Sequence, residues 1–148
     1  MCDMKVVKIE TDEQLKDAFA IRVEVFVNEQ GVPRELELDE LDVSPEACNH
    51  FLLLEEERPV ATGRFKNYEP SVAKMQRIAV LQSSRGLGVG KFLLLAMEAE
   101  AKSMGYRYSL LDAQCTAEDF YLKLGYVTES EEPFLDAGIR HVRMRKSL

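Results

Sequence analysis

Several residue types that would place the chain in a particular class of protein are scarce. Its 148 residues include three cysteines, an odd number without CxxC spacing, and two histidines that stand far apart. We therefore expect reduced thiols, as in a cytosolic protein, and no metal site. No apolar run approaches the roughly 20 residues that cross a bilayer, and the N-terminal MCDMKVVKIE lacks the apolar core of a secretory signal. A cytoplasmic protein without a membrane partner is expected.

Charge argues against one further class of partner. The net charge of −7, with a pI near 5.0, makes nucleic-acid binding through a general basic surface unexpected. The charges are unevenly placed, because acidic residues crowd positions 35–42 and basic residues crowd positions 140–146. We expect most of these side chains to form solvated faces. The alternative for the acidic stretch is a field that favours a cationic substrate.

Three helices are indicated by apolar spacing and by end signals. Apolar positions three and four residues apart predict a first helix that Thr11 or Asp12 can cap, and the glycine and proline of segment 28–33 break it. A second helix is expected over 88–104 and ends at a glycine. A third is expected to begin at Thr116, paired with Asp119 in a capping box.

The order of the expected elements indicates the fold class. Strands are expected over 4–10, 50–57, 59–66, 73–81, 107–113, 126–127 and 139–145. Neither a strictly alternating doubly wound fold nor a barrel gives this order. We therefore predict a single α/β (α+β) domain over residues 1–148, with a central mixed, mostly antiparallel sheet of about seven strands and helices on both faces. Glu100 falls on the apolar side of its helix and has no evident partner.

The segment SSRGLGVGKF, residues 83–92, lies between an expected strand and an expected helix and has three alternating glycines. It does not match a Walker loop, because position 85 is arginine and Lys91 is followed by phenylalanine. It also lacks the G-x-G-x-x-G spacing of a dinucleotide fingerprint. Arg85, Gly88 and Gly90 do satisfy R-x-x-G-x-G, in which backbone N–H groups, a helix N-terminus and basic side chains favour a pyrophosphate. The alternative is a tight turn with incidental basic residues.

Two motifs together resemble one enzyme family. The strand MQRIAVL, the R-x-x-G-x-G turn and the long helix are similar to motif A of the GNAT superfamily of acetyl-coenzyme A-dependent N-acetyltransferases. Downstream, AEDFYLKLGYV resembles the A-x-x-F-Y-x-x-x-G-F/Y segment of that family, at the spacing the family uses. RVEVFVNEQGVP and FLDAGIRHVRM are similar to its small bacterial ElaA/YjcF-like branch. The order of strands and helices fits over nearly the whole chain.

The resemblance implies a binding site for acetyl-CoA. The strand before the turn would splay from its neighbour and expose backbone groups to the pantetheine, and the N–H near Val80 would be the oxyanion donor. Gln114, after the fifth strand, would reach the pantetheine amides. The implied cofactor-binding residues are Ile78, Ala79, Val80, Arg85, Gly86, Leu87, Gly88, Val89, Gly90, Lys91, Gln114, Phe120 and Tyr121.

The resemblance also implies catalytic and substrate-binding residues. Tyr121 aligns with the tyrosine that the family often places near the cofactor sulfur, so we predict that it is the general acid. The alternative for Tyr121 is a core aromatic, as we interpret Phe120. Glu29 lies in the segment that covers the acceptor site in this family, and could accept a proton, attract a cationic amine or be a solvated helix-end charge. Phe26 and Gln30 are the further expected substrate-binding residues.

Other side chains are weaker candidates for the base. They are Asp39, Asp42 and His50, and His50 begins a strand, where a structural histidine is more common than a base. Cys115 has no histidine neighbour in the sequence, and direct transfer needs no acyl-cysteine intermediate.

The leading hypothesis is an acetyl-CoA-dependent N-acetyltransferase that moves an acetyl group to a primary amine by direct transfer in a ternary complex. The acceptor would be a small-molecule or peptide amine. The first alternative is a non-catalytic module that binds coenzyme A, and the second is a nucleotide-binding protein, which the two failed nucleotide patterns disfavour. Members of the superfamily are often dimers, so a homodimer stays open.

Overall fold

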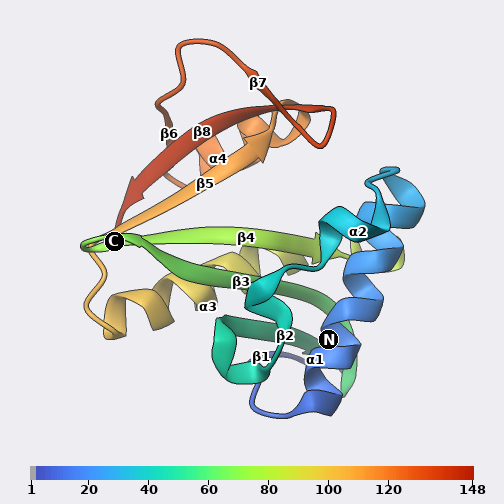
Figure 1. Cartoon of the computed structure of the whole chain (residues 1–148). Coiled ribbons are helices and arrows are strands. Elements are labelled where there is room, and N and C mark those ends of the chain that lie inside the picture. Colours follow the sequence, from blue (N-terminus) through green and yellow to red (C-terminus); the bar gives the residue numbers. More distant parts are fainter. Residues whose placement is uncertain (1–2) are drawn as a thin grey trace. The chain divides into compact units, whose positions relative to one another are not determined.

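The computed structural model describes residues 3–148, and Cys2 therefore lies outside the described residues. These residues group into two compact units, which we describe separately (Figure 1). The first unit comprises the chain up to Phe65 together with Arg77–Met97. The second comprises Lys66–Gln76 and Glu98–Leu148. The expectation of one domain over residues 1–148 stays a prediction.

The strands form a mixed sheet. They are β1 (Met4–Lys8), β2 (Asn49–Glu55), β3 (Arg58–Glu69), β4 (Val72–Val80), β5 (Tyr108–Gln114), β6 (Val127–Thr128), β7 (Phe134–Asp136) and β8 (Ile139–Ser147). β2 pairs antiparallel with β1 and β3, and β8 pairs antiparallel with β5, β6 and β7. β4 and β5, by contrast, pair in parallel. The predicted fold class is thus confirmed, although the three-residue strand β7 was not predicted.

The three expected helices are present, and the start of the third differs from the expectation. The helices are α1 (Asp12–Arg22), the π-helix η1 (Val23–Glu29), α2 (Arg34–Glu37), α3 (Val89–Ser103) and α4 (Glu118–Lys123), with 3-10 turns η2 (Glu40–Asp42), η3 (Pro45–Ala47), η4 (Gln82–Ser84) and η5 (Cys115–Ala117). Thr11 caps α1 as predicted, and its hydroxyl accepts from the Gln14 amide at 3.2 Å. The capping box predicted for Thr116 is wrong, because Thr116 lies inside η5 and Ala117 is the residue that precedes α4.

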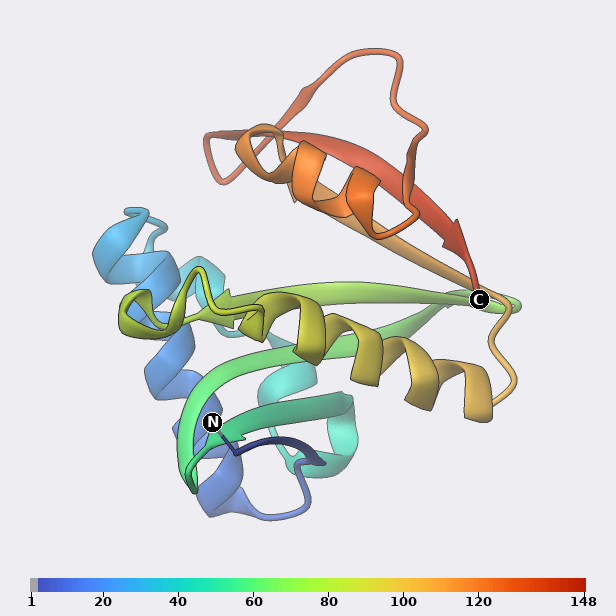
Figure 2. The same cartoon turned by 180° about the vertical axis from the view of Figure 1, so that it is seen from behind.

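Helices cover both faces of the sheet in the first unit. Leu15, Ala18 and Ile21 of α1 form one buried cluster with Leu52 of β2. On the other face, α3 approaches β3 so closely that a Cβ atom at Gly63 would come within 2.7 Å of the Met97 sulfur. In Figure 1 α1 lies in front of the strands and α3 behind them, and Figure 2 shows the reverse view. Helices on both faces, as predicted, therefore bury the first-unit sheet.

The acidic stretch departs most from expectation. Glu37 and Asp42 are buried, and both bind the guanidinium of Arg22, which is only 1% exposed. Arg22 Nε donates to Glu37 Oε1 at 2.5 Å, and its Nη atoms donate to the two Asp42 oxygens at 2.7 and 2.9 Å. Arg64 of β3 donates to Asp42 at 2.9 Å and to Asp39 at 2.7 Å. We call these five residues the buried ion-pair network. The predicted solvated face is wrong for Glu37 and Asp42, because two buried arginines compensate their charges.

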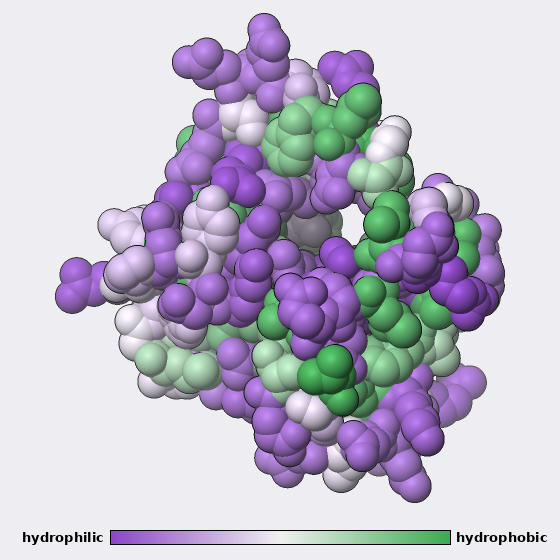
Figure 3. All heavy atoms as spheres, in the orientation of Figure 1, coloured by the Kyte–Doolittle hydropathy of each residue, from purple (hydrophilic) through white to green (hydrophobic). Residues whose placement is uncertain are grey.

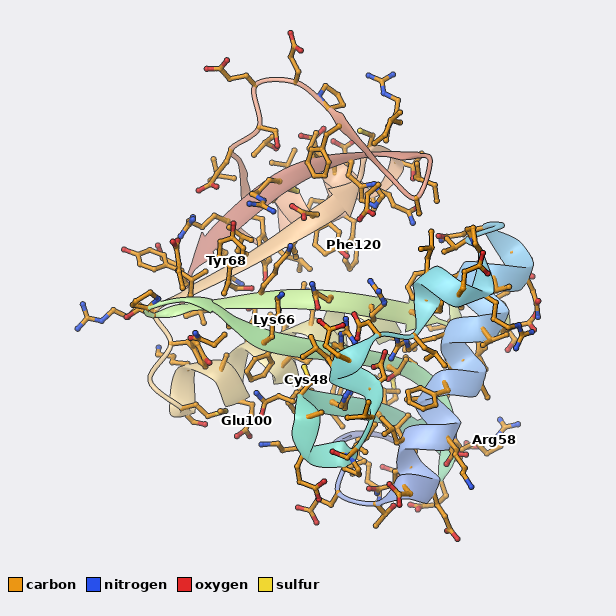
Figure 4. All side chains as sticks on the ribbon, in the orientation of Figure 1. Cys48, Arg58, Lys66, Tyr68, Glu100 and Phe120 are labelled. Carbon is orange, nitrogen blue, oxygen red and sulfur yellow. The ribbon has the colours of Figure 1, made fainter. Side chains whose placement is uncertain are left out.

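A second buried polar group stabilises the second unit. The Tyr126 hydroxyl donates to Glu98 Oε2 at 2.7 Å and lies 2.7 Å from Ser109 Oγ. Lys146 Nζ donates to the other Glu98 oxygen at 2.7 Å. The carboxylate on the buried side of α3 is therefore Glu98 and not Glu100, which is partly exposed and marked in Figure 4.

The basic cluster near the C-terminus is also paired. Arg143 donates to Asp112 at 2.9 Å and to the Tyr68 hydroxyl at 2.8 Å, and Tyr68 lies at the end of β3 (Figure 4). Arg145 Nε donates to Glu129 at 2.5 Å. Two arginines of the cluster are thus held in ion pairs along β8, whereas Arg140 is exposed, as expected of a solvated face.

The surface and the cysteines have the properties that the composition predicts. The face drawn in Figure 3 is covered mainly by hydrophilic residues, with small groups of hydrophobic residues between them. Cys48 and Cys115 are unpaired thiols, and Cys48 Sγ donates to the Phe65 carbonyl at 3.1 Å (Figure 4). Within residues 3–148, none of the helices has the length and apolar character needed to cross a membrane.

We predict that Arg22→Met lowers the free energy of unfolding by about 3–5 kcal/mol, because it leaves two buried carboxylates without their main partner. Urea unfolding followed by circular dichroism measures the change. Arg34→Met is the matched control, since Arg34 is exposed in the adjoining segment, and it should change the free energy by less than about 0.5 kcal/mol. Equal losses in the two variants would contradict the role of the network.

The network should also make stability depend on pH. Burial acts to raise the pKa of Asp42, but the hydrogen bond and charge of Arg22 outweigh it and hold this pKa well below its usual range. Such a carboxyl stabilises the fold above its unfolded pKa of about 3.9, and the gain is lost as the pH falls through the folded-state value. Urea unfolding at pH 7 and pH 3 measures this effect. Between these two pH values, the free energy of unfolding should fall less for Arg22→Met than for the wild type.

Candidate active site

The glycine turn links the end of β4 to the start of α3 within the first unit. Gly86 and Gly88 have positive φ angles of 82° and 78°, the left-handed region in which glycine is favoured. A Cβ atom at either position would meet nothing within 4 Å, so backbone conformation and not space explains the glycine. The side of the turn at these two positions is therefore open to a ligand.

The N-terminus of α3 has the properties of an anion site. The amide of Phe92 donates to the Gly88 carbonyl at 3.0 Å and closes the first helical turn. The amides of Val89, Gly90 and Lys91 precede this bond, and a helix leaves such groups without intrahelical acceptors. The first turn contains no acidic residue, and Lys91 is exposed. These groups, with the helix dipole, fit a diphosphate.

An irregularity in β4 directly precedes Ile78–Val80, the three residues whose backbone groups are predicted to contact the cofactor. Arg77 has a φ angle of 55°, which is unusual for a residue with a side chain. Its Nε lies 3.0 Å from Glu37 Oε2 and donates to the Glu37 carbonyl at 3.2 Å. The ion pair thus holds the irregular position in place. The register with β5 covers Val72–Met75, and the splaying predicted for Ile78–Val80 stays a prediction.

Glu29 and Arg85 form an ion pair in the same unit. Arg85 Nη2 donates to Glu29 Oε1 at 3.0 Å and also to Oε2, while Arg85 Nε donates to the Val80 carbonyl at 2.9 Å. Glu29 is thus an exposed helix-end charge that is paired with Arg85, and its predicted role toward the acceptor stays a prediction. Glu29 ends the π-helix, a local widening of the helix that is frequent at functional sites.

A cavity of about 400 Å³ lies beside this ion pair. Its lining consists of Glu24, Glu29, Leu81, Gln82 and Ser83. Phe26 packs against the hydrophobic cluster of α1 and β2, and Gln30 directly follows the π-helix. Their predicted contact with substrate stays a prediction.

The weaker base candidates belong to the buried ion-pair network or contact it. His50 is buried, its Nε2 lies 2.8 Å from the Leu41 carbonyl, and burial lowers its pKa. The structural interpretation of His50 is thus confirmed. Asp39 and Asp42 are occupied by arginines, so neither has the free lone pairs that a base requires.

The remaining predicted residues lie in the second unit. Gln114 ends β5, and Phe120 and Tyr121 lie on α4, where their rings meet edge to face at 5.0 Å. The Tyr121 ring also contacts that of Tyr126 at 5.8 Å. Burial raises the pKa of Tyr121 to about 12, so its phenol is protonated at neutral pH and can donate a proton. Phe120 is 41% exposed and is therefore not a core aromatic.

Comparison with known proteins decides the family. The sequence matches the acetyltransferase (GNAT) domain over residues 7–148. The chain belongs to the GNAT acetyltransferase family. It is 46% identical over 143 residues to YjcF of Bacillus subtilis, an uncharacterized N-acetyltransferase, with 97% of this chain and 99% of the relative covered. The resemblance inferred from the two sequence motifs is confirmed.

Solved structures of GNAT-like fold agree with this assignment. Escherichia coli ElaA superposes with a TM-score of 0.83 at 22% identity, covering 99% of both chains. The PaiA N-acetyltransferase of Thermoplasma acidophilum, solved in complex with coenzyme A, superposes with a TM-score of 0.76 at 16% identity and also covers 99% of both chains. Both likenesses concern the fold.

Sequence reasoning missed several residues that support this GNAT site. The signal for Arg22 was present, because it falls among the apolar positions of the first helix. Arg77 and Glu37 gave no comparable signal, since their pairing joins positions 40 residues apart. Among the described residues, no group of three or more His, Cys, Asp or Glu side chains is arranged to hold a metal ion.

The conformation of the GNAT turn predicts a difference between two of its glycines. Gly88→Ala should lower the free energy of unfolding by about 1–2 kcal/mol, because its φ of 78° is unfavourable for alanine. Gly90→Ala is the control, since Gly90 lies within α3, where alanine is favoured by about 0.5–1 kcal/mol. Thermal unfolding of both variants measures the difference. A Gly88→Ala variant as stable as wild type would contradict the positive φ.

Proposed function

We propose that the chain is an acetyl-CoA-dependent N-acetyltransferase that transfers an acetyl group directly to a primary amine in a ternary complex. The observation that supports this most is the glycine turn at the N-terminus of α3, where open backbone amides and Lys91 meet the requirements of a diphosphate. Membership of a family that generally depends on acetyl-CoA, and the coenzyme A complex of PaiA, support the same ligand. The acceptor would be a small-molecule or peptide amine.

The residues of the turn and of β4 would bind the cofactor through their backbones. The amides from Arg85 to Lys91 would hold the diphosphate, and Ile78, Ala79 and Val80 would bind the pantetheine. Gln114 and Phe120 are the further proposed contacts. When bound, acetyl-CoA supplies an acyl thioester. The Val80 N–H would then donate to the charge that develops on the carbonyl oxygen.

Two side chains have proposed roles in proton transfer and acceptor binding. An alkylammonium has no free lone pair and a pKa near 10, so the acceptor must lose a proton before it attacks. Glu29, with Gln30 and Phe26, would bind the acceptor, and Glu29 would favour a cationic one. The Tyr121 hydroxyl would give its proton to the departing sulfur, which suits a phenol that stays protonated up to about pH 12. A cytoplasmic location and a homodimer stay predictions.

Binding and turnover experiments test this proposal in two steps. Calorimetric titration with acetyl-CoA should give saturable binding, and titration with ATP should not. Thiol release is then followed with polyamines, aminoglycosides, amino acids and peptide N-termini. Binding of ATP without acetyl-CoA would overturn the proposal. Binding of acetyl-CoA without turnover of any amine would favour the non-catalytic module instead.

We predict that Tyr121→Phe retains acetyl-CoA binding but lowers kcat by about 10²–10⁴-fold, the range that general acid catalysis contributes. Steady-state thiol release at saturating acceptor measures kcat. Tyr108→Phe is the control, since Tyr108 is a partly exposed tyrosine of the same unit that contacts Arg145 through its ring. An unchanged kcat in Tyr121→Phe would remove the acid role.

A further inference from the structure

Arg85 is positioned so that it can bind either the Glu29 carboxylate or a diphosphate. Its Nε donates to the Val80 carbonyl at 2.9 Å, which fixes the guanidinium at the end of β4. Its Nη2 donates to Glu29. The Arg85 side chain is 43% exposed, so an incoming anion can reach it without unfolding any element. Arg85 also begins the turn that leads to the N-terminus of α3, where a diphosphate is proposed to bind.

Glu29 faces a cavity that is suited to an ammonium group. The cavity of about 400 Å³ is lined by a second carboxylate, Glu24, by the polar side chains of Gln82 and Ser83, and by the apolar Leu81. Glu24 accepts from Asn28 at 2.9 Å and has no recorded contact with Arg85. The charge of Glu29, by contrast, is compensated by Arg85. While the ion pair is closed, one of the two carboxylates that line the cavity is therefore occupied by Arg85.

A diphosphate and Glu29 would compete for the same N–H donors. A phosphate group binds a guanidinium through the planar fork that a carboxylate also uses. The bond from Nε to Val80 need not break in the exchange, because the Nη groups would donate to the phosphate while Nε stays bound. The ion pair itself is exposed enough that it contributes little to stability, which makes its opening inexpensive.

We infer that the Arg85–Glu29 ion pair couples the two ligand sites: binding of the coenzyme A diphosphate takes Arg85, and the released Glu29 carboxylate then binds the ammonium group of the acceptor. The inference rests on the proposed function and adds to it a means by which the cofactor prepares the acceptor site. Because coupling between sites is reciprocal, a bound ammonium should also favour the state in which Arg85 is free for the diphosphate.

Coenzyme A binding tests the first half of the inference. Glu29→Gln should bind coenzyme A about three- to fivefold more tightly than wild type, because Arg85 no longer has to leave a carboxylate. Glu24→Gln, which removes a carboxylate from the same cavity without touching Arg85, should bind as wild type does. Pantetheine lacks the diphosphate and should bind wild type and Glu29→Gln equally. Thermal unfolding of each variant checks that it is folded.

A double-mutant cycle separates competition for Arg85 from a general change of charge. Arg85→Gln should weaken coenzyme A binding, and in that background Glu29→Gln should have no further effect. If Glu29→Gln tightens binding equally with and without Arg85, the tighter binding results only from the loss of one negative charge, and the inference is wrong. Unchanged affinity in Glu29→Gln would also overturn it. A wild type that binds no coenzyme A would instead overturn the proposed function.

A small ammonium probe tests the second half. Saturation-transfer NMR with ethylammonium should detect binding to the wild-type complex with coenzyme A, and at least threefold less to the free protein. Glu29→Gln with coenzyme A should show no more binding than free wild type, and ethanol, a neutral probe of similar size, should bind none of them. Equal ethylammonium binding with and without coenzyme A, or no binding in either state, would overturn the coupling.

Discussion

The contact between Arg22 and the carboxylates of Glu37 and Asp42 is the interaction on which the first unit depends. Arg22 is the last residue of α1, directly before the π-helix that ends at Glu29. Through Asp42 it is linked to Arg64 of β3, and through Glu37 to Arg77 of β4. The five charges of the network and Arg77 thus tie the first helix, the acidic segment and two strands together. Since an unpaired buried charge is very costly, these elements must fold in one arrangement.

This network also explains how the site is oriented. The π-helix that contains Glu29 begins where Arg22 is fixed, and Ile78–Val80 begin where Arg77 is fixed. The π-helix of the proposed acceptor site and the β4 segment of the proposed cofactor site are therefore attached to the same buried charges. Glu37 and Asp42 are buried and hold other residues in place, whereas Glu35 and Glu40 of the acidic stretch are exposed. A field that favours a cationic substrate stays a prediction.

The elements that local chemistry determines were predictable from the sequence. Thr11 with Gln14, the glycines of the turn, and the apolar spacing of α1 and α3 each depend on neighbours within a few residues. The fates of Glu37, Asp42 and Glu98 were not predictable, because their partners are 15 or more residues away and a charged side chain is usually exposed. Glu29 belongs to the same group, since its partner Arg85 is 56 positions away.

Tyr121 and Tyr126 belong to the same short motif, but their surroundings differ and so do their proposed roles. Burial raises the pKa of both, but the Tyr126 hydroxyl is committed to Glu98 and Ser109, and Gly125 brings the chain close to Lys146, which completes that group. No hydrogen bond of the Tyr121 hydroxyl is recorded within residues 3–148. The Tyr126 proton is shared with a carboxylate, whereas the Tyr121 phenol is protonated at neutral pH, as its proposed role as an acid requires. The motif therefore contains one tyrosine that stabilises the second unit and one for which we propose a catalytic role.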